Sequence, residues 1–263
     1  MIYLHQQKAI EYITEKFRTD PQVNALIISG SIAHGFNDKN SDIDINIIVS
    51  NSSYEQKINS NALTYWESAG NFYKGGYFDG KYITLDYLDM VAKRGNEPTR
   101  FALHDSIIAF DKTGQVADFI EKIGTFNEDA IQKNTFGFLS QFEAWKWYCN
   151  EALKRKNKYL LDTSVTKFIL FSGRLILLDN KIFFPYHKWF IKVLENAPLK
   201  PPKLMDAIFN LTNRKSEKNI NFLYQIVKNY KDWANGINYS WSSYFLKDIE
   251  TVWMRGEDFI ENI

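Results

Sequence analysis

Two aspartates separated by one isoleucine are the residues best suited to metal chemistry in this 263-residue chain. Asp42 and Asp44 lie in the segment DIDINI, where polar and apolar residues alternate with period two. In an extended conformation both carboxylates lie on one face, about 7 Å apart at Cα, and the isoleucines lie on the other. Carboxylates this close repel each other unless a cation neutralises them. Because Mg²⁺ prefers oxygen ligands and often shares its site with phosphates, the pattern predicts a magnesium site, whereas an acidic outer face on a solvated edge strand is the simpler alternative.

A third acid is expected on a later strand. The segment 71–89 resembles two strands joined at Asp79-Gly80, because Asp-Gly is a favoured two-residue hairpin turn. The second of these strands carries Asp86 on its polar face. If that strand neighbours the first two aspartates in one sheet, the three carboxylates converge on a metal site. Asp79 and Asp89 are rivals, but the first is expected in the turn and the second beyond the strand.

A small polar turn precedes the two aspartates and has the features of a phosphate site. Gly30 would allow a phosphate to approach the backbone closely, and the Ser31 hydroxyl would donate a hydrogen bond to it. Gly35 would provide a positive φ for the return of the chain, and His34 would contact the phosphate-bearing ligand or cap the local backbone. The alternative is an ordinary helix entry, since serine is a good N-cap.

A mixed α/β frame is expected to position these residues. The opening segment has apolar residues at helical spacing among polar ones, which predicts an amphipathic surface helix. Short apolar runs around residues 25–29 and 43–49 predict buried strands on either side of the glycine-serine turn. The pattern also predicts a helix over residues 55–69 and a short edge strand over residues 106–111.

The pattern changes near residue 127. Beyond it, aromatic and aliphatic residues recur at helical spacing, with one helix expected to stop at Asn180, and three prolines in NAPLKPPKL separate further helical sequence. We therefore predict an α/β fold of the α+β type. A small mixed-sheet domain at residues 1–126 carries the acidic residues, and an aromatic-rich α-helical bundle domain follows at residues 127–263.

Composition excludes several classes of protein. The formal net charge of +1 gives no global basic field, so nucleic acid is an unlikely partner. A single cysteine, Cys149, excludes an intramolecular disulfide and a cysteine cluster, and it is expected to be an inert core thiol. His104 and His187 have no metal-ligand spacing and are expected to be structural or surface groups. The single cysteine fits a reducing compartment, so we expect a cytoplasmic protein. No apolar run reaches the roughly 20 residues of a membrane span, so we expect no membrane contact.

At this point the motifs amount to a resemblance. Gly30-Ser31, the later Asp42 and Asp44 pair in an apolar strand, and Asp86 resemble the nucleotidyltransferase superfamily that includes DNA polymerase beta. The resemblance covers about the first 90 residues. It implies magnesium-dependent transfer of a nucleoside monophosphate from a nucleoside triphosphate to a hydroxyl, with release of pyrophosphate. By position it implies that the aspartate pair binds metal and the glycine-serine turn binds triphosphate. For Asp86 it implies a metal, the acceptor hydroxyl, or both.

The layout of an α/β half followed by an aromatic helical half is also similar to the aminoglycoside nucleotidyltransferases and their uncharacterised relatives. The segment NKIFFPYHKWF, residues 180–190, is similar to a segment of their helical half. This resemblance implies that Lys188 contacts phosphate or substrate. A lysine stem lying over the neighbouring aromatic rings is the structural alternative. A separate glutamate base is not evident, so the general base stays open.

The expected activity is that of a Mg²⁺-dependent nucleotidyltransferase with ATP as the expected donor. The expected acceptor is a small molecule with a hydroxyl group, held between the two domains. The second resemblance makes an aminoglycoside-like molecule one candidate for this acceptor. Transfer to a protein side chain or an RNA end is a variant of the same reaction. The alternative from another class is a catalytically silent nucleotide-binding module that acts as a regulatory or interaction partner. The sequence leaves the oligomeric state open, because aromatic surface also suits an interface.

Overall fold

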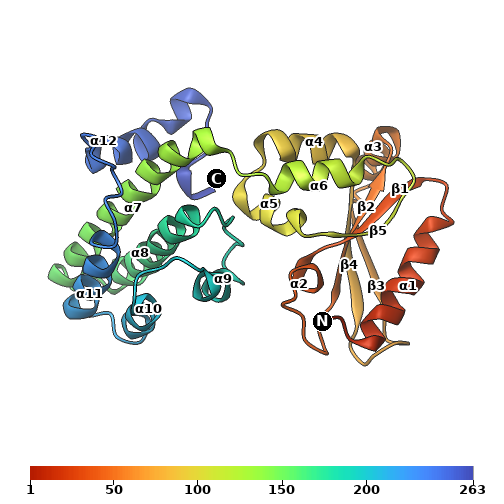
Figure 1. Cartoon of the computed structure of the whole chain (residues 1–263), viewed down its shortest axis with the longest axis horizontal. Helices are drawn as coiled ribbons and strands as arrows, with labels where there is room; N and C mark the ends of the chain where they lie inside the picture. The colour runs from red at the N-terminus through yellow and green to blue at the C-terminus, as the bar shows by residue number, and fades with distance from the viewer. Residues whose placement is uncertain (263) are drawn as a thin grey trace. The chain divides into compact units, whose positions relative to one another are not determined.

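The computed structural model describes residues 1–262 and divides the chain into two compact units, shown in Figure 1. The first unit is Met1–Phe126, and the second begins at Asn127. This division falls at the position where the sequence pattern changes from mixed to helical.

A single mixed sheet forms the centre of the first unit. Within residues 1–262 it has five strands in the order β3-β4-β2-β1-β5. The strands are β1 (Val23–Ile28), β2 (Ile43–Val49), β3 (Thr64–Ser68), β4 (Tyr77–Ile83) and β5 (Ile107–Asp111). β4 runs parallel to β2, and the other neighbouring strands are antiparallel. The predicted fold class is confirmed, as are the two buried strands and the edge strand.

Helices cover the two faces of this sheet unequally (Figure 1). The helices of this unit are α1 (Leu4–Arg18), α2 (Gly30–Ala33), α3 (Asn51–Asn59), α4 (Leu85–Arg94), α5 (Glu97–His104) and α6 (Val116–Gly124). α1 packs its apolar stripe, which includes Ile13, against one face, where Ile45 of β2 is buried. On the other face α4 and α6 cover apolar residues near the end of β2, among them Ile48. The polar residues at the start of β2 lie on this second face and are not fully covered.

Two predicted elements of this unit are wrong. In place of the helix over residues 55–69, α3 ends at Asn59 and β3 follows. The Ser50 side chain caps α3 earlier than expected by accepting a hydrogen bond from the Ser53 N–H. β3 contains the sequence TYWES, whose aromatic and β-branched residues favour a strand.

The expected hairpin turn at Asp79-Gly80 is also absent, because both residues lie inside the continuous strand β4. A Cβ on Gly80 would lie 2.8 Å from a side-chain carbon of Ile45. This glycine therefore permits close packing between β4 and β2 and does not form a turn. The strand ends at Ile83, and the side chain of the next residue, Thr84, caps α4 by accepting from the Tyr87 N–H.

The second unit is helical. Its helices are α7 (Glu128–Lys154), α8 (Lys158–Asp179), α9 (Phe190–Asn196), α10 (Leu204–Asn213), α11 (Glu217–Lys228) and α12 (Trp241–Phe245), followed by short turns at Leu246–Glu250, Val252–Arg255 and Ile260–Asn262. α7 and α8 form its largest helix pair, and α8 ends at Asn180 as predicted. Arg174 of α8 is buried and donates to the carbonyls of Ile260 and Glu261, which attaches the end of the described chain to the bundle.

None of the helices described for residues 1–262 combines the length and the apolar character needed to cross a membrane.

Candidate active site

Three carboxylates meet where β2 and β4 run side by side. Asp44 on β2 is the direct register partner of Asp79 on β4, and Asp42 precedes β2. One oxygen from each of these three side chains lies within 4.8 Å of the others. Parallel strands in register point opposed side chains to the same face, which explains the convergence. The predicted pairing of Asp42 with Asp44 on one face agrees with this arrangement.

The third acid of this cluster is Asp79, and the predicted strand position of Asp86 is wrong. Asp86 lies in the first turn of α4, where its Oδ2 accepts a hydrogen bond of 2.6 Å from the Asn51 side chain. The part of β4 from Asp79 to Ile83 spans about 13 Å at ~3.3 Å per residue, so Asp86 lies beyond the far end of the strand. Tyr77, Asp79 and Lys81 alternate with period two, which could have predicted that Asp79 lies on a strand and shares a face with the other two. The turn assumed at Asp79-Gly80 excluded this assignment.

The glycine-serine turn lies directly against this cluster. Gly30 has φ of +63°, and a Cβ at this position would lie 1.8 Å from Oδ2 of Asp44. The Ser29 N–H donates a 2.9 Å hydrogen bond to the Asp44 carbonyl, which fixes the end of β1 beside β2. Only a residue without a side chain permits this approach. The backbone of the turn is therefore held next to the carboxylates.

The Ser31 hydroxyl is a buried polar group of the glycine-serine turn. The side chain is buried at 6% exposure, and among the described residues its Oγ has no hydrogen-bond partner. A buried polar atom without a partner is costly, and in a native structure it often marks a binding function. α2 has four residues, so the turn backbone and the hydroxyl, and not a long helix dipole, are the groups that could bind phosphate.

Two polar residues that the sequence analysis did not select lie on the same sheet face. Asn46 on β2 and Lys81 on β4 are register partners, two positions after Asp44 and Asp79. Asn46 is buried and donates a 2.9 Å hydrogen bond to the Ser29 hydroxyl. Desolvation lowers the pKa of Lys81, and the carboxylates of Asp44 and Asp79 oppose this shift. The residue as a whole is solvent-exposed, so its position on β4 is the stronger reason to assign it to the site.

A tyrosine borders the acidic cluster. The hydrogen bond and charge of the Asp42 carboxylate raise the pKa of Tyr77 above its ordinary value. The phenol is therefore protonated at neutral pH and can donate a hydrogen bond. The site thus combines acceptors for metal with donors for oxyanions within one unit.

These residues fit a divalent metal ion. Three carboxylates, without a nitrogen or sulfur ligand, form a donor set of the type that Mg²⁺ prefers. Because residue 30 is a glycine, only backbone atoms lie beside the Asp44 carboxylate at this point, and no side chain occupies the space next to it.

Lys188 belongs to the second unit. It is exposed, and its ammonium lies 5.4 Å from the centre of the Trp189 ring. A phosphate or substrate contact by Lys188 stays a prediction.

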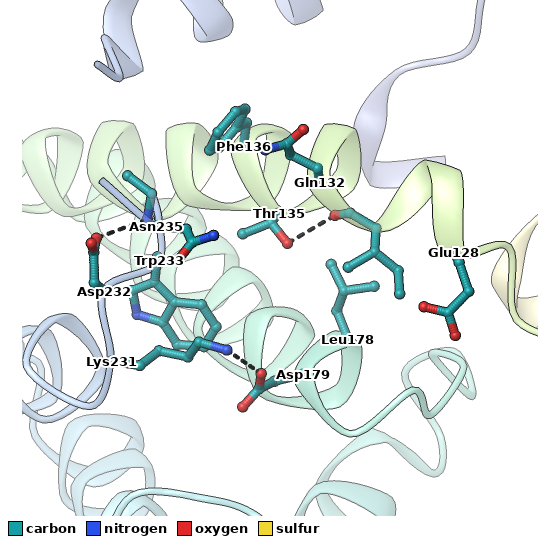
Figure 2. A pocket seen from close by; sticks show the side chains of 12 residues that line it. Glu128, Gln132, Thr135, Phe136, Leu178, Asp179, Lys231, Asp232, Trp233 and Asn235 are labelled. Atoms are coloured by element: carbon teal, nitrogen blue, oxygen red, sulfur yellow. Dashed lines mark hydrogen bonds and ion pairs between the residues drawn. The ribbon is translucent and has the colours of Figure 1, made fainter. Parts of the chain in front are cut away.

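The second unit also contains a cavity of about 430 Å³, lined by residues of α7, of the end of α8 and of the segment 231–235 (Figure 2). Its charged side chains already have partners within the protein. Lys231 pairs with Asp179, and Asp232 accepts from the Ala234 N–H. Thr135 donates to the Ile131 carbonyl. The internal partners of these side chains do not favour a second catalytic centre in this cavity.

A mixed sheet with three carboxylates beside a glycine-serine turn is an arrangement that suits nucleotidyl transfer. Residues 11–68 match the family model described as polymerase beta, nucleotidyltransferase. This part of the first unit is thus similar to the nucleotidyltransferase domains of the polymerase beta type. The match includes the glycine-serine turn and the first two aspartates and ends before Asp79.

One solved structure that matches is the crystal structure of a nucleotidyltransferase-like protein from Exiguobacterium sibiricum 255-15. The two chains are 12% identical, with a TM-score of 0.47, and the match covers 96% of this chain and 80% of the other. No curated protein matches the chain.

Proposed function

We propose that this protein is a Mg²⁺-dependent nucleotidyltransferase. It transfers a nucleoside monophosphate from a nucleoside triphosphate, with ATP the expected donor, to a hydroxyl of a small-molecule acceptor. The observation that supports this most directly is the convergence of Asp42, Asp44 and Asp79 within 4.8 Å, against a glycine that leaves no room for a side chain. An aminoglycoside-like acceptor rests only on the resemblance of the layout.

Each residue has a separate role in this proposal. Asp42, Asp44 and Asp79 would hold the metal, which would supply positive charge to the triphosphate and to the acceptor oxygen. The turn at Gly30 and Ser31 binds the β- and γ-phosphates through backbone N–H groups and the serine hydroxyl.

The transfer itself forms one bond and breaks one bond. The acceptor oxygen bonds to the α-phosphorus as the bond from that phosphorus to the bridging oxygen breaks, and pyrophosphate leaves. The proton of the acceptor hydroxyl passes to a carboxylate, for which Asp79 is the candidate because it is the most exposed of the three. Lys81, on the same strand face, places a positive charge near the phosphates. Catalysis is then mostly orientation and electrostatic stabilisation.

The experiment that tests the proposal measures pyrophosphate release from each nucleoside triphosphate with Mg²⁺, against a panel of aminoglycosides and other hydroxyl-bearing metabolites. We expect Asp79→Asn to reduce acceptor-dependent release by about 1,000-fold, which corresponds to about 4 kcal/mol of transition-state stabilisation. Asp86→Asn is the matched control and should retain activity, because Asp86 lies on α4.

Two other outcomes would contradict the proposal. Equal loss of activity in Asp79→Asn and Asp86→Asn would contradict the assignment of Asp79. Magnesium-dependent nucleotide binding without release for any acceptor would favour the silent binding module. Lys188→Ala tests the remaining prediction, and a role in phosphate binding requires a higher KM for the nucleotide.

A further inference from the structure

A second cluster of potential metal ligands lies on the first unit, apart from the carboxylates of the active site. His34 immediately follows α2, and His104 and Asp105 lie at the end of α5. One ligand atom from each of these three side chains lies within 4.8 Å of the others. The fold therefore brings together nitrogen and oxygen donors that are about 70 positions apart in the chain.

The carboxylate of Asp105 lies between the two imidazole rings. Its Oδ2 is 3.3 Å from Nδ1 of His34, and its Oδ1 is 2.9 Å from Nδ1 of His104. A tetrahedral ion with bonds of about 2.1 Å holds its ligand atoms about 3.4 Å apart. The Oδ2 of Asp105 and Nδ1 of His34, 3.3 Å apart, are close to this spacing. The ligand atom of His104 lies within 4.8 Å of both.

The surroundings hold one ligand firmly and leave another accessible. The His34 side chain is 5% exposed and stacks on Phe101, with ring centres 4.3 Å apart. Its Nε2 is buried and has no hydrogen-bond partner among the described residues. By contrast, the Asp105 side chain is 55% exposed and the His104 side chain 23%. An ion could enter from the Asp105 side and keep water in a fourth position.

We propose that His34, His104 and Asp105 bind one transition-metal ion of the Zn²⁺ type, separate from the Mg²⁺ site. Two imidazoles and one carboxylate form a donor set that suits zinc and its neighbours better than magnesium. The bound ion would link His34, which follows α2, to the end of α5. It thereby restrains the position of the proposed phosphate-binding turn. This proposal does not depend on the proposed catalytic activity.

The test uses tag-free, chelator-stripped protein titrated with Co²⁺, whose visible absorption reports nitrogen ligation, and then with Zn²⁺ in competition. We expect one equivalent to bind to the wild type. His104→Ala and Asp105→Asn should each weaken binding by at least about 100-fold, because loss of a direct ligand exceeds the 10–100-fold effect of outer partners. Asp105→Asn changes an exposed side chain, so it tests the site without dependence on the packing of His104.

Two matched controls separate this site from others. Asp42→Asn/Asp79→Asn alters only the proposed Mg²⁺ site, and His5→Ala/His187→Ala removes the other two histidines of the chain. Both should bind cobalt like the wild type. The proposal is overturned if wild-type protein binds no cobalt, if binding survives in both ligand variants, or if either control loses it.

Discussion

Carboxylates are arranged differently in the two units of this protein. In the helical unit several of them contact lysines: Glu143 with Lys228, Asp162 with Lys215, and Asp179 with Lys231. In the sheet unit Asp42, Asp44 and Asp79 instead gather around one another. Lysine pairs stabilise a fold modestly, whereas gathered carboxylates repel each other and cost stability. The difference agrees with a structural role for the helical pairs and with the cation site proposed for the sheet cluster.

The largest effect is expected where the turn meets this cluster. Gly30→Ala and Gly35→Ala both place a side chain at positive φ, +63° and +68° respectively. Each should lower the free energy of unfolding by about 1–2 kcal/mol for the backbone alone. Only at Gly30 would the new Cβ collide with Asp44, since nothing lies within 4 Å at Gly35.

Urea denaturation and pyrophosphate release measure the two effects in these variants. Gly30→Ala should therefore be less stable than Gly35→Ala and should also lose nearly all activity. Similar stability and activity in the two variants would mean that the turn does not position the carboxylate.

Local patterns were sufficient to predict much of the fold. The alternation in β2 and the helical stripes of α1 and α8 are periodic over whole elements, so the sequence alone defines them. The Asp79-Gly80 step was misassigned because its turn preference is local, whereas the space beside Ile45 that requires Gly80 depends on tertiary packing.

The residues of the candidate site also fall into two groups, those that the sequence pattern could identify and those that depend on tertiary structure. Gly30, Ser31 and the first two aspartates occur in one continuous motif and could be selected from the sequence. Asp79 required the parallel pairing of β4 with β2, which no short segment encodes. The contact between the rings of His34 and His104 likewise depends on how α5 packs. Sequence spacing does not contain this information, and it therefore predicted only a structural or surface role for His104.

A smaller effect is expected from a carboxylate that pairs within the helical unit. Glu143 accepts from Lys228 at 2.6 Å and from Tyr224 at 3.0 Å, and its side chain is 12% exposed. Glu143→Gln should lower the free energy of unfolding by about 1 kcal/mol, because partly buried partners lose a charged acceptor. Chemical denaturation would measure the change.

Glu128→Gln is the control in the same unit. Its side chain is 64% exposed and pairs with Lys181, so the change should be close to zero. A larger loss from Glu128→Gln would contradict the structural role assigned to the buried pair.

The opposite sign is expected in the acidic cluster. In the absence of divalent metal, Asp79→Asn should raise the free energy of unfolding by up to about 0.5 kcal/mol, because like charges opposed on neighbouring strands are destabilising. Added Mg²⁺ should stabilise the wild type and not this variant. Thermal unfolding with and without Mg²⁺ measures both effects, with Asp86→Asn as the control that should respond like the wild type. A loss of stability in metal-free Asp79→Asn would show that these carboxylates do not repel each other.

The smallest effect concerns a paired carboxylate in the sheet unit. Glu67 of β3 accepts hydrogen bonds from Lys16 at 2.5 Å and from Tyr12 at 2.8 Å, both on α1, and also from Tyr65. Burial alone would raise the pKa of Glu67, but these hydrogen bonds outweigh it and hold the pKa below its ordinary value. A lowered pKa means that the folded state favours the ionised form.

The contribution of Glu67 to stability is therefore complete above its unfolded pKa and is lost as the pH falls through the lower, folded pKa. We expect a contribution of about 0.3 kcal/mol, near the low end for exposed pairs, because Lys16 remains 44% exposed. Urea denaturation at a series of pH values from neutral to acid should show a shallower dependence for Glu67→Gln than for the wild type. Glu11→Gln, at an exposed position on α1, is the control. If the two variants have the same pH dependence, the contact of Glu67 with α1 does not stabilise the sheet unit. Stabilising carboxylate–lysine pairs would then be a feature of the helical unit and not of the sheet unit.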